Sequence, residues 1–249
     1  MKLLEDKVAI ITGAGSGIGK ATALLFAEQG AKLIVSDISE ENGKTAVEEI
    51  NAKGGEASFF KADSASPAEN EALVAYAIKQ YGKLDIAVNN AGIGGPLALT
   101  GEYPLDGWKK TIDINLSGVF YGLRYQIPAM LKKGGSIINI ASILGQAGTK
   151  VPPAYVAAKH GVVGLTKAAA LEYADKNIRI NSVGPGYIKT PLVMKSLDDV
   201  ARKALVGLHP IGRLGEAEEI AELILWLASP KSSFVTGAYY PADGGYLAQ

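Results

Sequence analysis

The sequence predicts a doubly wound α/β fold, a parallel sheet of about seven strands with helices on both faces. Apolar runs of strand length, rich in Val, Ile and Leu, alternate with longer stretches of helical period along the 249 residues. Strands that are apolar at consecutive positions are buried on both faces, because a solvent-exposed face would place polar residues at alternate positions. Helices between such strands provide the crossovers that a parallel sheet requires.

The predicted elements follow one another in strand–helix order. Strands are expected at 7–12, 32–37, 57–63, 84–90, 136–142, 178–183 and around 238–242. Helices are expected at 18–29, near 40–53, after Pro67 until Tyr81 or Gly82, in two stretches divided near Ser117 and Gly118, and at 153–175, 191–206 and 216–228. No Pro/Gly/Ser linker, charge run or repeat divides them, so we expect one domain over residues 1–249.

Composition excludes several classes of protein. Lys and Arg number 25, as do Asp and Glu, so the chain lacks the basic excess of a nucleic-acid-binding protein. With no Cys and only two His, it also lacks disulfides, thiolate chemistry and a His-rich metal centre. Glu5 and Asp6 interrupt the apolar stretch of a signal peptide, and no apolar run approaches the ~18 residues of a membrane span. We therefore expect a cytoplasmic protein that binds neither nucleic acid nor membranes.

The helix predicted at 153–175 is small and apolar on nearly every side between Ala154 and Ala170. A helix that is apolar all round must be covered all round. The sheet can cover one face, and the other face needs a second helix or a second subunit. We favour a second subunit, and hence a homo-oligomer.

Four glycines lie within seven residues directly after the first strand, in the segment TGAGSGIG (12–19). Glycines at a strand-to-helix turn let the backbone approach a diphosphate, which the free N–H groups of the helix N-terminus bind. The P-loop pattern fails, because Ala14 occupies its first glycine position and Ala21 replaces its magnesium-binding hydroxyl. The common G-x-G-x-x-G spacing fails because residue 18 is Ile. A tight turn without a ligand is the alternative to a dinucleotide site.

The second predicted strand ends in Asp37, 18 residues beyond Gly19. An acidic side chain ~20 residues after such a loop meets the adenosine ribose of NAD. Asp37 could instead cap the next helix, but Ser39 is available for that role. No Arg stands nearby, and Lys20, on the helix beyond the last glycine, is expected to point away. NAD is therefore the predicted cofactor, because the 2′-phosphate of NADP would meet the carboxylate.

Further polar residues lie at the carboxyl ends of later strands, where open α/β sheets bind ligands. Tyr155 and Lys159 are four residues apart on one helix face, and Ser142 ends the fifth strand 13 residues before Tyr155. Asn115 lies in a helical stretch before that strand, and NNAG (89–92) ends the fourth strand. A phenol beside an ammonium and a hydroxyl suits proton transfer to or from a substrate oxygen.

TGAGSGIG, NNAG, Asn115, Ser142, YVAAK (155–159) and PG (185–186) together resemble the short-chain dehydrogenase/reductase family, in the family's order and with its spacing. The resemblance covers nearly the whole chain and is to the branch with chains of this length. It implies a Rossmann-type sheet and hydride transfer between a nicotinamide and a carbonyl or alcohol carbon.

The resemblance implies that Tyr155 is the general acid and base, that Ser142 hydrogen-bonds the substrate oxygen and that Lys159 binds the nicotinamide ribose. An ordinary tyrosine titrates near ~10, and we expect the Lys159 ammonium and the oxidised nicotinamide to lower this pKa. Asn115 would hold a water that links Lys159 to solvent. The alternatives are a structural role for Asn115 and a strand-end cap for Ser142.

The cofactor-binding residues that the resemblance implies line the groove between strand ends and helix starts. They are Gly13, Ser16, Gly17, Ile18, Gly19, Asp37, Ala62, Asp63, Asn89, Ala91, Gly92, Tyr155, Lys159, Pro185, Gly186, Ile188 and Thr190. Asp63 would meet the adenine, with a simple loop cap as the alternative. Thr190, expected at the carboxamide, could equally be a helix N-cap. His160 is expected to be structural and His209 to lie in a surface loop.

Substrate identity depends on variable stretches at 93–97, at 143–146 with 151–153, and at 187–208, with a lid around 187–209. The predicted substrate-binding residues are Ser142, Leu144, Tyr155 and Tyr187, and other apolar side chains expected at the pocket are Leu97, Ile143, Leu192, Val193 and Met194. The cations able to clamp a substrate carboxylate or phosphate are Lys150, Lys189 and Lys195. An apolar pocket suits an uncharged secondary alcohol or ketone, including a cyclic or aryl-bearing one. The alternative is that these apolar side chains only pack the lid and do not contact a substrate.

Two other functions remain open. A reductase of β-ketoacyl groups on acyl carrier protein would need a basic patch for its acidic partner and commonly prefers NADP, which Asp37 and the neutral charge balance disfavour. A non-catalytic dinucleotide-sensing protein on the same fold should have lost Tyr155 or Lys159, and neither is lost.

The tail DGGYLAQ (243–249) resembles that of some tetrameric relatives, in which the terminal Gln approaches a magnesium ion between subunits. A frayed terminus is the alternative. We therefore predict a homotetramer, and no metal site unless subunits share an ion at Gln249.

Overall fold

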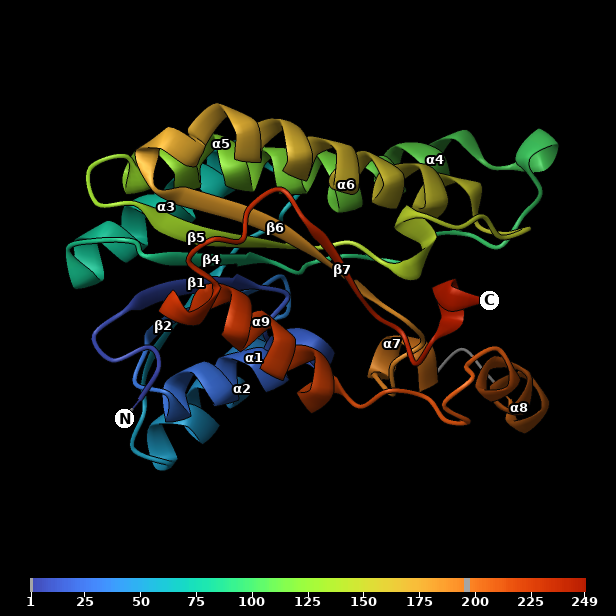
Figure 1. Ribbon diagram of the computed structural model, residues 1–249, viewed down its shortest axis with the longest axis horizontal. Helices are drawn as coiled ribbons and strands as arrows, with labels where there is room; N and C mark the ends of the chain where they lie inside the picture. Colours follow the sequence, from blue (N-terminus) through green and yellow to red (C-terminus); the bar gives the residue numbers. More distant parts are fainter. Residues whose placement is uncertain (1, 195–197) are drawn as a thin grey trace.

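The computed structural model describes residues 2–194 and 198–249, and within them seven parallel strands form one sheet in the order β3-β2-β1-β4-β5-β6-β7 (Figure 1). The strands are β1 (Val8–Thr12), β2 (Lys32–Asp37), β3 (Glu56–Lys61), β4 (Ile86–Asn89), β5 (Gly135–Ile140), β6 (Ile178–Pro185) and β7 (Tyr239–Ala242). Each overlaps a predicted apolar run. The doubly wound parallel fold is confirmed.

Helices cover both faces of the sheet (Figure 1). On one face lie α1 (Gly17–Glu28), α2 (Glu40–Ala52) and α9 (Ala217–Ala228), with a core that includes Phe26 and Ile224. On the other lie α3 (Pro67–Tyr81), α5 (Gly118–Met130) and α6 (Pro153–Tyr173), with a core that includes Leu73 and Met130. The shorter helices α4 (Leu105–Ile112), α7 (Pro191–Met194) and α8 (Asp199–Gly207) lie toward the carboxyl ends of the strands (Figure 1).

The strand order reverses at β1, which pairs with β2 on one side and β4 on the other. From β1 the chain moves outward to β2 and β3, then returns to β4 and continues outward through β7. The loops after β1 and β4 therefore leave the sheet in opposite directions and open a crevice between them, which is where ligands bind in open α/β sheets.

Several boundaries differ from the prediction in ways that matter for the site. β3 ends at Lys61, so Ala62 and Asp63 lie in the loop that follows, and β6 continues to Pro185. The division predicted near Ser117 is a π-helical turn, Asp113–Ser117, between α4 and α5. The helix predicted at 191–206 corresponds to α7 and α8, and residues 195–197 lie outside the description.

The outer face of α6 is only partly covered. Its inner face packs on β5 and β6, and α4 covers part of its length. Leu171 near its end is nevertheless 85% exposed, and Phe120 on the neighbouring helix α5 is 48% exposed. The fold thus leaves apolar surface exposed on α6, for which a covering subunit was predicted, and also on α5, for which none was predicted.

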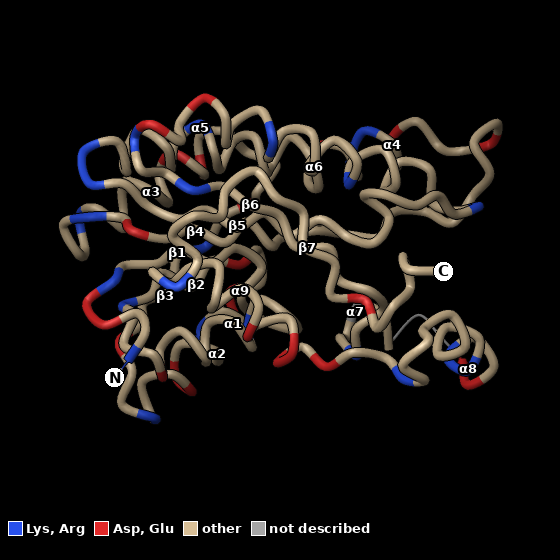
Figure 2. Tube along the Cα trace, in the orientation of Figure 1, with Lys and Arg blue, Asp and Glu red and all other residues tan. Residues whose placement is uncertain are grey.

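Lys and Arg residues are interspersed with Asp and Glu residues along the chain trace (Figure 2). Within the described part of the chain, no helix combines the length and the apolar character needed to cross a membrane.

Candidate active site

A cavity of about 480 Å³ opens at the carboxyl ends of the strands, beside the point where their order reverses. It gathers most of the predicted site residues from segments far apart in the sequence. The predicted residues that line it are Gly13, Ser16, Gly17, Ile18, Asp37, Ala62, Asp63, Ala91, Gly92, Asn115, Ser142, Tyr155, Lys159, Pro185, Gly186, Ile188 and Thr190. Gly19, Asn89, Leu144 and Tyr187 are not among its lining residues.

The glycine loop has the form expected of a phosphate cradle. Gly13 and Gly17 have φ of 62° and 54°, and a Cβ on Gly13 would stand 2.9 Å from the Ala91 Cα. Asn90 Nδ2 holds the loop by donating to the Thr12 and Gly13 carbonyls at 2.9 and 3.1 Å. Helix α1 begins at Gly17 with no side-chain cap and no acidic residue in its first turn. Its positive end is therefore available to an anion in the cavity.

Asp37 lies at the end of β2 beside this loop. Its carboxylate accepts hydrogen bonds from the Gly15 and Ser39 backbone N–H groups, both at 2.9 Å. A carboxylate has about four acceptor positions, so two remain for ribose hydroxyls. Ser39 caps α2, as predicted, by accepting from the Asn42 N–H. The carboxylate is thus not used as the helix cap.

Two lysines differ in their relation to Asp37. Lys20 forms an ion pair with Glu49 at 2.6 Å, which agrees with its predicted orientation away from the site. Lys61 stands opposite Asp37 in the β2–β3 register, a cation that the sequence analysis missed. Lys44 lowers the pKa of Glu40 most strongly, and the Lys61 charge lowers the same pKa further. Lys61 is exposed, so solvent weakens its effect on the carboxylate.

Lys159 is a buried cation at the centre of the cavity wall. Only 3% of it is exposed, and Nζ donates to the Ile140 carbonyl at 2.7 Å. Burial lowers the pKa of Lys159 to about 8. Its Nζ lies 5.5 Å from the centre of the Tyr155 ring, so the ammonium lies near the phenol ring as the four-residue spacing predicts.

The prediction that Lys159 and the oxidised nicotinamide lower the pKa of Tyr155 concerns the enzyme with its cofactor, whereas in the chain alone this pKa is raised. Burial raises it, a hydrogen bond with the Ser142 side chain lowers it, and Tyr187 raises it further. Burial is the largest of these effects, so the pKa of Tyr155 in the chain alone lies above its ordinary value.

Ser142 serves two purposes. Its Oγ accepts from the Leu144 N–H at 3.2 Å and so caps the short turn Ile143–Gly145, the role considered as an alternative. It also lines the cavity with Tyr155. The Leu144 N–H occupies one acceptor position of Oγ, and the Ser142 side chain also hydrogen-bonds Tyr155 beside the cavity.

Asn115 is fully buried in the π-helical turn. Its Nδ2 donates to the Ile93 and Thr111 carbonyls, both at 2.9 Å, and its Oδ1 accepts from the Ile93 N–H at 3.1 Å. A Cβ on Gly92 would lie 2.6 Å from Oδ1, so glycine is needed beside it. The side chain holds the loop after β4 against the cavity, which is the structural role considered as an alternative.

The comparisons with known proteins agree on one family. The family model described as enoyl-(acyl carrier protein) reductase matches residues 13–247. The cyclohexanol dehydrogenase of Acinetobacter sp. (strain SE19) is 53% identical over 246 residues, covering 98% of this chain and 96% of that protein. The 3-oxoacyl-(acyl-carrier-protein) reductase of Thermotoga maritima is 43% identical over 98% of this chain and 99% of its own. A crystal structure of a short-chain type dehydrogenase/reductase from Mycobacterium marinum superposes with a TM-score of 0.94 at 37% identity, over 99% of this chain and 97% of that one.

The chain belongs to the short-chain dehydrogenase/reductase family. It is an oxidoreductase whose relatives act on alcohol groups, and members of this family use a nicotinamide cofactor. The cavity fits such a group, since the glycine loop, the uncapped start of α1 and the free acceptor positions of Asp37 suit a diphosphate and a ribose.

Four predicted site residues of this short-chain dehydrogenase/reductase do not line the cavity. A Cβ on Gly19 would lie 2.3 Å from the Gly13 carbonyl oxygen, so Gly19 lets α1 pack on the loop. Asn89 is buried and exchanges hydrogen bonds with Gln126 at 2.8 and 3.1 Å. Leu144 is buried within the turn Ile143–Gly145 that follows Ser142. Tyr187 lines a second cavity of about 190 Å³.

The prediction that His209 lies in a surface loop is wrong. Only 3% of His209 is exposed, and its ring packs against Tyr187 and Tyr246, with ring centres 5.8 Å away in each case. Nε2 accepts from the Tyr187 N–H at 3.1 Å, and Nδ1 lies 2.8 Å from the Leu205 carbonyl. This pair of bonds requires the tautomer with the proton on Nδ1. His209 thereby joins α8 and the C-terminal turn to the segment that follows Gly186. His160, by contrast, is exposed, with Nδ1 at 2.9 Å from the Val156 carbonyl.

The apolar side chains expected at the substrate end are only partly placed there. Val193 lines the cavity, whereas Leu97 is 77% exposed and Ile143 is buried. Met194 is not among the lining residues, and the side chain of Leu192 lies outside the described part. Asn90, Ile93 and Pro191 also line the cavity and lie within the predicted segments 89–92, 93–97 and 187–208. Lining residues that the sequence analysis missed are Ile38, Ser64, Lys110, Ile114, Ile140 and Ala141. Most directly follow or precede a predicted residue, and that adjacency is the signal that could have found them.

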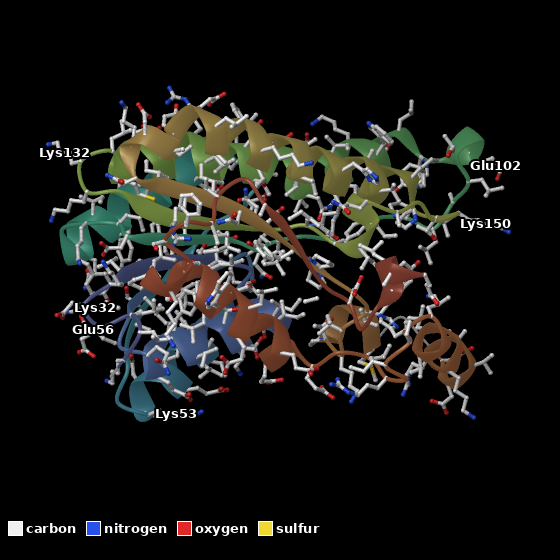
Figure 3. The ribbon with its side chains drawn as sticks, in the orientation of Figure 1. Lys32, Lys53, Glu56, Glu102, Lys132 and Lys150 are labelled. Carbon is white, nitrogen blue, oxygen red and sulfur yellow. The ribbon has the colours of Figure 1, made fainter. Side chains whose placement is uncertain are left out.

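Two of the three cations proposed for an anionic substrate, Lys150 and Lys189, are not among the lining residues. Lys150 points outward into solvent (Figure 3), and Lys189 pairs with Glu216. Lys195 lies outside the described residues. The lysines that do line the cavity are Lys110 and Lys159.

Two loop and terminal residues show local contacts. Asp63 accepts from the Ala65 N–H at 2.9 Å, which is a loop cap, while also lining the cavity. Gln249 is docked, since its Nε2 donates to the Leu208 carbonyl at 3.1 Å. Within residues 2–194 and 198–249, no group of three or more His, Cys, Asp or Glu side chains could hold a metal ion.

We expect His209→Phe to disturb the segment after Gly186 while keeping a ring of similar size. The change leaves the Tyr187 N–H without its acceptor, which should lower the free energy of unfolding by about 1–3 kcal/mol. Deuterium exchange at the Tyr187 amide should become faster. His160→Phe, at the exposed histidine, is the control. Unchanged protection of the Tyr187 amide in His209→Phe would contradict this role.

Proposed function

We propose that this enzyme transfers a hydride between NAD and an uncharged cyclic secondary alcohol or the corresponding ketone, with Tyr155 as the general acid and base. The observation that carries the proposal is the convergence of Ser142, Tyr155 and Lys159 on the cavity that also holds the glycine loop and Asp37. A ring-bearing alcohol is favoured because a relative 53% identical is named cyclohexanol dehydrogenase. Apolar lining residues such as Ile93 and Val193 suit such a ring.

When bound, the nicotinamide cofactor supplies or accepts the hydride. Tyr155 exchanges a proton with the substrate oxygen: its phenolate takes the proton of an alcohol, and its phenol returns a proton to a ketone. Ser142 donates its hydroxyl proton in a hydrogen bond to the same oxygen, and so stabilises negative charge that develops there. The turn Ile143–Gly145 holds the Ser142 side chain in place for this contact.

Lys159 has two proposed roles. Its buried ammonium, near the Tyr155 ring, favours the phenolate over the phenol. It also binds the ribose hydroxyls of the cofactor. Since burial lowers the pKa of Lys159 to about 8, the ammonium persists below that pH and is lost as pH rises through it. Asn115 holds the loop after β4 and, in this proposal, a water that connects Lys159 to solvent.

Tyr155→Phe tests the chemistry. The change keeps the ring and removes the phenolic proton, so turnover should fall by at least ~10²-fold, the scale of general acid–base catalysis. Binding of the cofactor, followed by the change in its fluorescence, should persist. Tyr173→Phe, at the far end of α6, makes the same change away from the cavity and should leave turnover intact. Turnover of the wild-type rate in Tyr155→Phe would exclude Tyr155 as the acid and base.

The choice of NAD over NADP rests on Asp37. A 2′-phosphate placed against this carboxylate would meet like charge at a cost on the order of 1–4 kcal/mol for effective dielectric constants of 80 to 20. Among the described residues no Arg lines the cavity, and Lys20 is paired with Glu49. Lys61 is the nearest opposing cation in the sheet register, and it is exposed.

Steady-state kinetics with both cofactors tests this preference. NAD should exceed NADP by at least ~tenfold in kcat/KM, because about 1.4 kcal/mol corresponds to that factor. Asp37→Ser should narrow this gap mainly by raising kcat/KM with NADP. It should also lower kcat/KM with NAD, because the N–H groups of Gly15 and Ser39 lose their acceptor. Lys61→Met is the control and should change the ratio by less than about twofold, as expected for an exposed charge. Equal or better efficiency with NADP would show that Asp37 does not face the ribose.

A reductase of β-ketoacyl thioesters is the second candidate. The relative from Thermotoga maritima, named a 3-oxoacyl-(acyl-carrier-protein) reductase, favours it. Purified enzyme should be assayed at 340 nm with NAD and panels of cyclic and open-chain secondary alcohols, sugars and hydroxy acids, and in the reverse direction with a β-ketoacyl thioester and NADPH. Preference for cyclohexanol-like substrates supports the first proposal, and preference for the thioester would replace it with the second.

We also propose a homotetramer in which a second subunit covers the exposed apolar surface of α5 and α6, including Phe120 and Leu171. Sedimentation at micromolar concentration should show four chains, and a monomer there would refute the assembly. If subunits share an ion at Gln249, EDTA should lower the melting temperature of the tetramer. An unchanged melting temperature would exclude that ion. In the same proposal, residues 187–209, which include α7 and α8, form the substrate lid.

A further inference from the structure

Tyr239, the first residue of β7, reaches across β6 to the active site. Its hydroxyl donates to the main-chain carbonyl of Ser142 at 2.9 Å, a contact between residues 97 positions apart. β7 pairs with β6, and β6 pairs with β5, the strand after which Ser142 lies. The phenol of Tyr239 therefore connects the outermost strand to the serine that lines the cavity.

Gly184 makes this contact sterically feasible. A Cβ on Gly184 would lie 1.9 Å from the Tyr239 hydroxyl oxygen, 2.2 Å from Cζ and 2.6 Å from Cε2. Gly184 is not among the glycines with positive φ, so its backbone does not itself require glycine. It is the Tyr239 ring that leaves no space for a side chain at this position of β6.

Of the other hydrogen bonds that hold Ser142, one joins its side chain to Tyr155 on α6, and two lie within its own turn. The Ser142 carbonyl accepts from the Gly145 N–H at 2.8 Å, and Oγ accepts from the Leu144 N–H at 3.2 Å. Both donors belong to the same short turn and would move with it. Tyr239 is the partner from a distant strand, and its bond fixes this turn relative to the sheet.

The Tyr239 hydroxyl is suited to act as a permanent donor. Burial, with the Asp243 charge, raises the pKa of Tyr239 to about 12. The hydroxyl thus keeps its proton at the pH values where Tyr155 would exchange one.

We propose that Tyr239 is a positioning residue: together with the space left by Gly184, it holds the Ser142 turn so that the Ser142 hydroxyl meets the substrate oxygen. The proposal rests on the proposed function of Ser142. Tyr239 acts through Ser142 and does not itself touch the substrate.

Tyr239→Phe keeps the ring and removes the bond to Ser142. We expect kcat with cyclohexanol and NAD to fall about two- to tenfold, the range that one neutral hydrogen bond contributes. KM for NAD and the melting temperature should change little, because the Gly145 N–H still bonds to the Ser142 carbonyl. Tyr240→Phe is the matched control. Tyr240 is the next residue of β7, and its ring packs on Trp226 with centres 6.0 Å apart.

A double-mutant cycle with Ser142→Ala separates positioning from general stability. If Tyr239 acts through the Ser142 hydroxyl, Tyr239→Phe should have no further effect on the residual turnover of Ser142→Ala. An equal fall of kcat in both backgrounds would overturn the proposal, as would wild-type kcat in Tyr239→Phe beside a disabled Ser142→Ala. Wild-type turnover in Ser142→Ala would instead refute the proposed function of Ser142, and this inference with it.

Gly184→Ala tests the space independently. The added methyl group should displace the Tyr239 ring and reduce kcat at least as much as Tyr239→Phe does. In the Tyr239→Val background, which lacks the ring, adding Gly184→Ala should lower neither kcat nor the melting temperature any further. Wild-type kcat and melting temperature in Gly184→Ala would show that the ring does not depend on the glycine.

Discussion

The reversal of strand order at β1 is the constraint on which the rest of the molecule depends. Because β2 and β4 flank β1, the loops after β1 and β4 diverge and leave the carboxyl ends of the strands uncovered. Asn90 then ties the two loops together through the Thr12 and Gly13 carbonyls. The crevice therefore has a wall whose backbone is fixed on both sides. A dinucleotide site then also needs glycines where the protein backbone comes closest to the diphosphate.

The end of β5 supplies the second fixed point. The carbonyl of Ile140 orients the Lys159 ammonium, and two residues later Ser142 lines the same cavity. Helix α6 brings Tyr155 and Lys159 to this point from one face of the sheet, while β7 contacts it across β6 through Tyr239. Polar groups from separate elements thus meet at one strand end, and backbone hydrogen bonds there hold their arrangement.

Much of this could be predicted from the sequence, because the relevant signals are local. Continuous apolar runs revealed all seven strands, and the spacing of Tyr155 and Lys159 placed both on one side of a helix. The errors concern contacts between distant segments. His209 precedes a proline in a loop, yet the ring is buried because Tyr187 and Tyr246 close over it. Asn89 is the last residue of β4, but its side chain hydrogen-bonds Gln126 on α5 and is buried in the core. Lys61 is opposite Asp37 only through the β2–β3 register, which the sequence does not specify.

The electrostatics of the site follow from an imbalance in the cavity wall. Lys159 is almost fully buried, and within the described part of the chain no carboxylate pairs with it. A carbonyl dipole compensates a buried cation only in part, and this is why burial lowers the pKa of Lys159 to about 8. The same burial raises the pKa of the neighbouring Tyr155. Each group alone is thus disfavoured in its charged form, whereas a phenolate and an ammonium formed together would stabilise each other at low dielectric. The Lys159 ammonium therefore lies beside the Tyr155 phenol without a negatively charged partner. A phenolate, formed when the phenol loses its proton, would be that partner.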